Sequence, residues 1–320
     1  MAQHFLLSAA ARTLKLRDIY RMSDDAAYEA FKAIRFSENG GDAYCPDCGC
    51  VETYAITTRR KWKCAACHKQ FSVTSGTIFA SRKMAFVDLL AAIAIFVNAA
   101  KGISALQLSR DLGCQHKTAF VLAHKLREAM ARGNDGVMLN GVVEVDGAYF
   151  GGHVRPENRK EDRKDRRRSE NRDASRRVVI AVRQRGGRVL PFVRKTEAEG
   201  VKIVRERVEL GTELHADEAG HWDILETQYQ AHRINHSLAY SLDGACTNQA
   251  ESYFSRLRRT VDGQHHHVSP QHLHQYASEA AWREDHRRTD NGGLFKAAAT
   301  AATHSPISRQ WKGYWQRRAA

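Results

Sequence analysis

The chain has 320 residues, enough to bury a sizeable core and to form two or three domains. Lys and Arg outnumber Asp and Glu by 50 to 36, and the net charge of +14 predicts a polyanionic partner. The most apolar stretch, Phe86 to Ala100, contains Asp88 and Asn98, so it is too short and too polar to cross a membrane. No charged segment precedes the apolar residues of the N-terminus, so we expect no signal peptide and a cytoplasmic, reducing location.

The N-terminal part of the chain predicts a helical segment followed by a zinc ribbon. In residues 1–40, Ala26 to Phe36 alternates apolar and charged residues at helical spacing. Residues 41–78 contain two Cys-x-x-Cys pairs, formed by Cys45, Cys48, Cys64 and Cys67. Four thiolates at this spacing are typical ligands of tetrahedral zinc, whereas a redox motif needs a single pair. We expect these four cysteines to bind one structural Zn²⁺ ion.

Residues 79–133 predict a helical region of the helix-turn-helix type. Phe86 to Ala100 predicts one buried helix, and Ile103 to Leu112, Gly113 and Thr118 to Met130 follow as helix, tight turn and helix. The last helix is expected to present polar side chains outward, toward DNA: Gln115, His116, Lys117 and His124 or Lys125. A helical hairpin that binds nothing is the alternative interpretation of the same spacing.

The stretch Val142 to Gly152 predicts a strand that carries an aspartate into a turn bounded by glycine. Side chains alternate along a strand, so Val143 and Val145 point to one face while Glu144 and Asp146 point to the other. An ionised Asp is seldom buried without a partner. Asp146 therefore indicates a metal site, a salt bridge or a simple turn.

Two further stretches carry acids in comparable positions. Glu213 to Trp222 again leads a short apolar strand into an aspartate, Asp217. Thr247 to Arg259 has helical spacing, and it offers Asn248 and Glu251 as oxygen ligands. Asn248 followed three residues later by Glu251 also fits a helix-capping box, which is the structural alternative.

The remaining elements predict a mixed α/β domain over residues 137–290, entered through a glycine-rich linker at 133–136. Residues 155–177 hold eleven Lys or Arg and six Asp or Glu, so this basic insertion cannot pack a core and is expected to form a mobile loop. The flanking pattern predicts strands at 178–182 and 188–193 and helices at 199–208 and 222–229. This order suits a mixed sheet flanked by helices. Residues 291–320 are expected to form a basic tail, aromatic from Trp311 to Arg318.

Taken together, VDGAYFGG, ADEAGHW and TNQAESYFSRLRR resemble the catalytic motifs of DDE-type transposases, and the separation of Asp217 from Glu251 is close to that superfamily's spacing. More narrowly, the chain resembles the transposases of insertion-sequence family 1595, which carry an N-terminal zinc ribbon. The resemblance covers about residues 25 to 290. Members of this family use Asn or Glu as the third catalytic residue, followed by a Lys. This chain offers both Asn248 and Glu251, and it has Arg258 where a Lys is usual.

The resemblance implies a ribonuclease-H-like catalytic domain that cleaves and joins DNA with two Mg²⁺ or Mn²⁺ ions. Asp146 would bridge the ions, Asp217 would hold one, and Glu251 or Asn248 the other, while Arg258 would contact DNA phosphate. The implied partner is double-stranded DNA, both the terminal inverted repeats and the target, bound by a homo-oligomer and not at a membrane. The alternatives are a DNA-binding regulator or a domesticated, inactive transposase, and a structure-selective nuclease on the same fold.

Overall fold

The computed structural model describes residues 5–151, 157–163, 171, 175–234 and 246–318. These residues form two compact units, one comprising residues 1–133 and 286–320 and the other residues 134–285. The first unit is mainly helical and contains a three-stranded sheet, whereas the second is built on a five-stranded sheet. The mixed α/β class predicted from the sequence is confirmed. No helix among the described residues combines the length and the apolar character that a bilayer crossing requires.

The helices of the first unit come from both ends of the chain. They are α1 (Leu16–Tyr20), α2 (Asp24–Arg35), α3 (Phe86–Asn98), α4 (Ala105–Asp111), α5 (His116–Arg132), α9 (Asn291–His304) and α10 (Tyr314–Arg318). Short 3-10 turns lie at Phe5–Leu7, Ala9–Ala11, Ser37–Asn39 and Thr57–Arg59. Helices α2 and α4 begin where the sequence supplies a serine cap: the hydroxyls of Ser23 and Ser104 accept the N–H groups of Ala26 and Gln107.

Helix α3 is the centre of this unit because most of its side chains are buried. The rings of Phe31 and Phe86 lie 5.1 Å apart, and Phe79 adds an edge-on contact with Phe31 at 5.5 Å. Helix α9 packs on α2, α3 and α5. The expectation of a basic tail over 291–320 is therefore wrong for residues 291–304, since small apolar residues such as Ala298 and Ala302 let this helix approach its neighbours closely.

The ribbon is a small antiparallel sheet of β1 (Thr53–Ile56), β2 (Lys61–Cys64) and β3 (Gln70–Ser72). Trp62 of the middle strand stacks on Phe71 of β3, with ring centroids 5.8 Å apart, and it meets Phe36 at 5.6 Å. These rings are the main apolar contacts of the sheet. A segment with so little core needs a metal or another staple for stability.

The second unit contains the strands β4 (Val142–Phe150), β5 (Arg177–Gln184), β6 (Val189–Arg194), β7 (Glu213–Asp217) and β8 (Gln230–Ile234). Their order in the sheet is β6-β5-β4-β7-β8. Strands β4, β5 and β6 are antiparallel neighbours, whereas β7 runs parallel to β4 and to β8. This topology is consistent with the ribonuclease-H-like domain that the resemblance implied.

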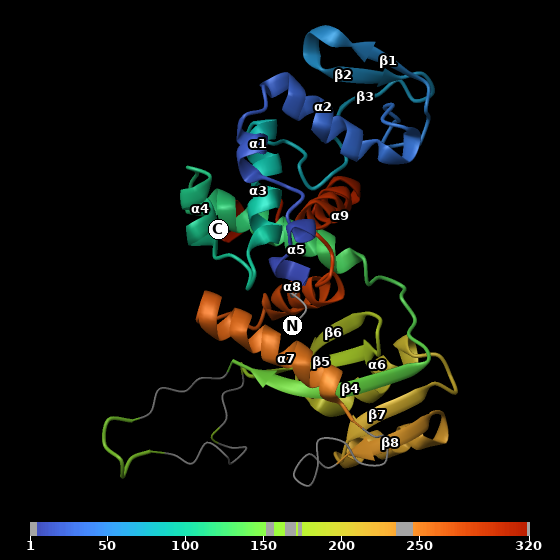
Figure 1. Cartoon of the computed structure of the whole chain (residues 1–320), viewed down its shortest axis with the longest axis vertical. Coiled ribbons are helices and arrows are strands. Elements are labelled where there is room, and N and C mark those ends of the chain that lie inside the picture. Colours follow the sequence, from blue (N-terminus) through green and yellow to red (C-terminus); the bar gives the residue numbers. More distant parts are fainter. Residues whose placement is uncertain (1–4, 152–156, 164–170, 172–174, 235–245, 319–320) are drawn as a thin grey trace. The chain divides into compact units, whose positions relative to one another are not determined.

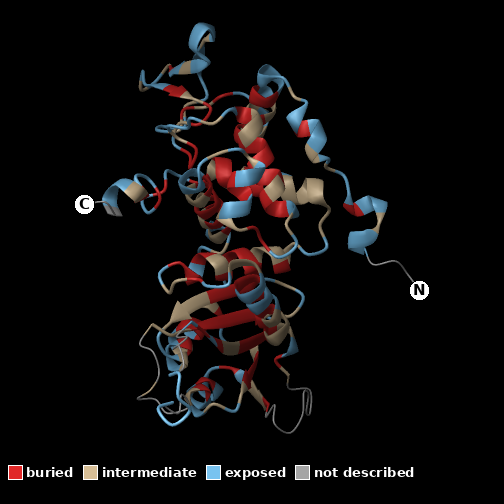
Figure 2. Ribbon diagram, turned by 90° about the vertical axis from the view of Figure 1, so that its left-hand side faces the viewer, coloured by how far each residue is buried: buried red, intermediate tan, exposed pale blue. Residues whose placement is uncertain are grey.

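Helices cover both faces of this sheet (Figure 1). They are the 3-10 turn η6 (Glu197–Glu199), α6 (Gly200–Arg207), the 3-10 helix η7 (Gly220–Thr227), α7 (Asn248–Thr260), its π-helical extension η8 (Val261–His265), and α8 (Leu273–Asp285). Val143 and Val145 pack toward α6 and η7, while Ala148 and Phe150 pack toward α7 and α8. Figure 2 shows the resulting band of buried residues along the strands. The alternation predicted for Val142 to Gly152 thus places Asp146 on the face of α7.

Two elements differ from the expectations. The helix expected at 222–229 is a 3-10 helix that begins at Gly220. Strand β8 was not predicted, because its Gln, His and Arg side chains mask the pattern and its burial depends on pairing with β7.

Candidate catalytic metal site and zinc centre

The sheet register brings Asp146 beside Asp217. Asp217 ends β7 as expected, but the expectation that Asp146 ends its strand in a glycine-bounded turn is wrong, because β4 continues through Gly147 to Phe150 and pairs there with β5. Val145 of β4 pairs with Ala216 of the parallel strand β7, so Asp146 and Asp217 are the next residues on adjacent strands. Neighbouring strands lie about 4.8 Å apart, and equivalent side chains point to the same face. Two carboxylates are thereby held side by side on rigid elements.

A third acid, Glu197, joins them. Ligand oxygens of Asp146, Glu197 and Asp217 all lie within 4.8 Å of one another. Glu197 is the first residue of η6, which begins after β6, and its carboxylate lies over Gly147, where any side chain would overlap it. Sequence reasoning missed this residue. The available signal was a capping box, in which Glu199 accepts the N–H of Thr196 at 3.0 Å and leaves Glu197 facing the sheet.

The three acids have no neutralising side chain beside them among the described residues. Within the described part of the chain, no Lys, Arg or His nitrogen lies within 4.0 Å of their carboxylates. Burial, and after it the charges of Asp217, Glu197 and Glu251, raises the pKa of Asp146 to about 7. Burial and then Asp217 also raise the pKa of Glu197. Each aspartate accepts few hydrogen bonds: Asp146 takes the N–H of Gly147 at 2.7 Å and Asp217 that of Ala219 at 3.2 Å.

This donor set fits a divalent cation. Mg²⁺ and Mn²⁺ prefer carboxylate oxygens, and oxygens within 4.8 Å of one another can share one ion after small side-chain rotations. A bound cation would also offset the repulsion that raises the pKa of Asp146. The cluster is therefore suited to chemistry in which negative charge develops on a phosphate.

Helix α7 carries the other predicted site residues. Glu251 is half-buried and close enough to Asp146 to raise its pKa, although the three-acid cluster does not include it. Asn248 is exposed at the first residue of the helix, and Arg258, also exposed, follows two turns after Glu251. The capping box on Asn248 does not form, because Asn248 is already the first residue of the helix. The N-cap position belongs to Thr247, whose side chain makes no capping hydrogen bond. The buried carboxylate of Glu144 accepts the first free N–H groups instead.

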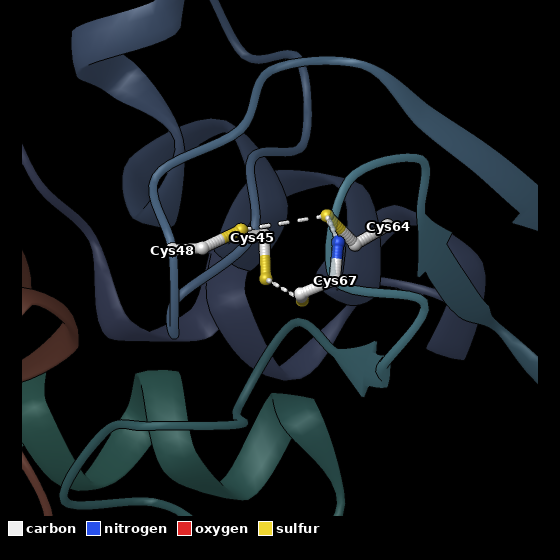
Figure 3. A group of neighbouring side chains, drawn as sticks. All are labelled: Cys45, Cys48, Cys64 and Cys67. Carbon is white, nitrogen blue, oxygen red and sulfur yellow. Dashed lines mark hydrogen bonds between the residues drawn. The ribbon is translucent and has the colours of Figure 1, made fainter.

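The four ribbon cysteines form a second group (Figure 3). Cys45 and Cys67 bring their sulfurs to 3.6 Å, and Cys48 and Cys64 to 3.5 Å. Sulfurs around a tetrahedral zinc with Zn–S bonds of about 2.3 Å lie about 3.8 Å apart, so the arrangement fits one structural zinc ion. The backbone N–H of Cys67 points at the sulfur of Cys64, at 3.4 Å, and lowers the pKa of that thiol to about 6. A thiolate is the form that binds metal.

We expect the wild-type chain to contain one zinc ion and the Cys64→Ser variant to lose it, together with the fold of the ribbon. Metal analysis of the purified proteins measures the stoichiometry. Cys50→Ser is the matched control, because Cys50 lies in the same segment, outside the group, with its sulfur 3.6 Å from the carbonyl of Glu52. Zinc retained by Cys64→Ser, or lost from Cys50→Ser, would contradict the assignment.

The predicted helix pair is present as α4 and α5, joined at Gly113, whose φ of +60° suits the tight turn. Gln115, His116 and Lys117 are exposed at the start of α5. Contact of these residues with DNA stays a prediction.

The outward orientation expected for His124 or Lys125 is wrong. His124 is fully buried and stacks on Trp311 at 4.2 Å, and Lys125 donates its Nζ to the carbonyl of Ile78 at 2.8 Å. Burial lowers the pKa of Lys125. The reason is a tertiary contact: the C-terminal segment, expected to be a basic aromatic tail, packs on this side of α5 through Trp311 and Tyr314. The sequence around α5 does not indicate this contact. Residues 155–156, 164–170 and 172–174 of the basic insertion lie outside the described residues, and with them the mobile loop expected there.

Two family models match the chain. Residues 138–285 match the family model of the ISXO2-like transposase domain. Residues 22–70 match the model of the transposase zinc-ribbon domain. No curated protein and no solved structure matches the chain.

Proposed function

The chain belongs to the transposases of insertion-sequence family 1595, and from this premise we propose that it cleaves DNA at the ends of its element and joins them to a target with divalent cations held by Asp146 and Asp217. The observation that supports the proposal is the half-buried acidic cluster without a neutralising cation among the described residues. Retaining such a cluster costs stability. A protein that only bound DNA would have no use for it.

The proposed roles follow from position. Asp146, whose pKa is raised by the charges of all three other acids, would contact both ions, Asp217 with Glu197 would hold one, and Glu251 the other. Bound Mg²⁺ or Mn²⁺ would supply the charge that stabilises the attacking and leaving oxygens of the phosphodiester. Because these carboxylates stand on strands and on packed helices, they would fix the reacting groups in place. Arg258, exposed on the same helix face as Glu251, would contact a DNA phosphate.

The reaction proposed is two successive phosphoryl transfers. In the first, the oxygen of water attacks the phosphorus at the element end, the bond to the 3′ oxygen breaks, and that oxygen leaves as a hydroxyl. In the second, this 3′ hydroxyl attacks a target phosphodiester and displaces the target's own 3′ oxygen. Joining two element ends at one target requires two active sites, so we propose an assembly of at least two chains on DNA.

Recognition of the ends is proposed for the helical unit. The start of α5 exposes Gln115, His116 and Lys117, and the net charge of +14 favours a polyanion. Lys125 is not proposed for this role, since its ammonium is engaged inside the fold. With chromosomal DNA as the substrate, the cytoplasm is the proposed place of action.

The test is a cleavage assay with purified protein and linear DNA that carries the sequences flanking the gene. We expect nicks at the element boundary and joined products in Mg²⁺ or Mn²⁺, and neither after chelation by EDTA. DNA with scrambled ends is the control. Binding to the element ends without cleavage in either cation would favour a DNA-binding regulator. Equal cleavage of DNA with native and with scrambled ends would favour a structure-selective nuclease.

A further inference from the structure

We infer that Glu144 is a positioning residue, which holds the first turn of helix α7 at a fixed place beside Asp146. The inference rests on the proposed function, because α7 carries Asn248 and Glu251. Glu144 would not itself contact the cations or the DNA. It acts through the helix that it holds.

The hydrogen bonds of Glu144 attach the start of helix α7 to strand β4. Its side chain is fully buried in the sheet, yet one carboxylate oxygen, Oε2, accepts the N–H of Gln249 at 2.8 Å and that of Ala250 at 3.0 Å. The other oxygen, Oε1, accepts the Nε of Arg185 at 2.8 Å. The first N–H groups of a helix have no partner within the helix, and the helix dipole favours an anion there. Thr247, the residue before the helix, offers no side-chain cap.

The pairing of β4 with β7 places Glu144 close to the proposed catalytic acids. Glu144 is two residues before Asp146 on β4, and its partner on β7, His215, is two residues before Asp217. His215 also contacts the start of α7, because the N–H of Cys246, two residues before the helix, donates to its Nδ1 at 3.3 Å. The pair of Glu144 and His215 therefore forms a layer adjacent to the pair of Asp146 and Asp217, on the same face of the sheet.

Arg185 and Gln249 complete this layer. Arg185 pairs with Glu144 and donates Nη2 to the carbonyl of Cys246 at 3.1 Å. The side chain of Gln249 accepts the Nε of Arg183 at 3.1 Å. The strands that carry the two aspartates are thus tied to the start of α7 through hydrogen bonds made by buried or half-buried groups. Such a connection fixes the distance from Glu251 to Asp146, on which a shared pair of cations depends.

The experiment compares Glu144→Gln with the wild-type protein in three measurements. Amide hydrogen exchange at Gln249 and Ala250 is expected to become about tenfold faster, because the neutral amide accepts these N–H groups poorly and its own NH₂ group opposes Arg185. The Mn²⁺ concentration that half-saturates the rise in melting temperature is expected to increase about tenfold. DNA cleavage is expected to fall at low Mn²⁺ and to recover in part at high Mn²⁺.

Glu279→Gln is the matched control. Glu279 is also fully buried, and it pairs with Arg283 at 2.8 Å, but it belongs to α8. This control is expected to lower the melting temperature without changing the Mn²⁺ midpoint. If Glu144→Gln fails to fold, Glu144→Asp keeps the charge on a shorter side chain, and the same measurements apply.

The outcomes separate the inference from the proposed function. Unchanged exchange at Gln249 and Ala250, or an unchanged Mn²⁺ midpoint in a folded Glu144 variant, overturns the positioning role. A wild-type protein that does not cleave DNA in any divalent cation overturns the proposed function, while hydrogen exchange still decides whether Glu144 holds the helix.

Discussion

Replacement of Asp146 by Asn is expected to lower DNA cleavage roughly 10³-fold in Mg²⁺ and, in the same molecule, to stabilise the metal-free protein. The two effects have one origin. Asp146 is held beside Asp217 and Glu197 in a half-buried cluster with no cationic partner among the described residues. The negative charge of Asp146 would bind a cation, but it lowers the stability of the folded protein when no cation is bound.

The pH dependence of the stabilisation has a definite sign. Burial and the neighbouring acids raise the pKa of Asp146 from 3.8 to about 7 in the folded chain. Between these values the folded protein keeps a proton that the unfolded chain has lost, so wild-type stability falls as the pH rises through this window. Asn carries no titrating proton. The variant's gain in melting temperature should therefore be small near pH 4 and largest above pH 7.

Thermal unfolding with and without Mg²⁺ measures this effect, and a gel assay measures cleavage. Asp223→Asn is the control, because Asp223 follows Asp217 in η7 but is exposed and paired with Arg233 at 3.2 Å. We expect it to leave both activity and stability nearly unchanged. An Asp146→Asn protein that is less stable than the wild type without metal at pH 8 would contradict the account of the cluster.

The site residues that could be predicted from the sequence and those that could not differ in the kind of physical signal on which they depend. Asp146 and Asp217 were predictable because each follows apolar residues of a strand, and strand alternation fixes the face to which it points. The four cysteines were predictable because zinc ligands have characteristic spacing. Both signals are local, and each is contained in one short segment of the chain.

The residues that were missed depend on contacts between distant segments. Glu197 lies in a short turn, and only the sheet brings it over Gly147. Glu144 was assigned to the correct face, but its partners Gln249 and Ala250 belong to a distant part of the chain. His124 looked like an outward-facing residue because nothing near it in the sequence indicates the stacking of Trp311. Periodicity describes a residue's own element, and it does not identify which element covers it.

Helix α7 offers two candidates for the remaining metal ligand, Asn248 and Glu251. We expect a large difference in DNA cleavage between variants of these two residues. Asn248 and Glu251 are three residues apart on α7, so both face the same side of the helix. Glu251 is half-buried and its charge acts on Asp146, whereas Asn248 is exposed. An anionic carboxylate also neutralises a divalent cation far better than a neutral amide.

We therefore expect Glu251→Gln to lower cleavage by about 10²-fold or more, and Asn248→Ala to lower it less than about tenfold. Glu197→Gln belongs in the same series, because its oxygens lie close to those of Asp146 and Asp217. If Glu197 shares an ion with them, this variant should weaken Mn²⁺ binding as well as cleavage. Near-normal cleavage by Glu251→Gln, with a folded but inactive Asn248→Ala, would show that the amide is the ligand. That result would also mean that the first residue of α7 turns toward the cluster when cations bind, since Asn248 is exposed in this structure.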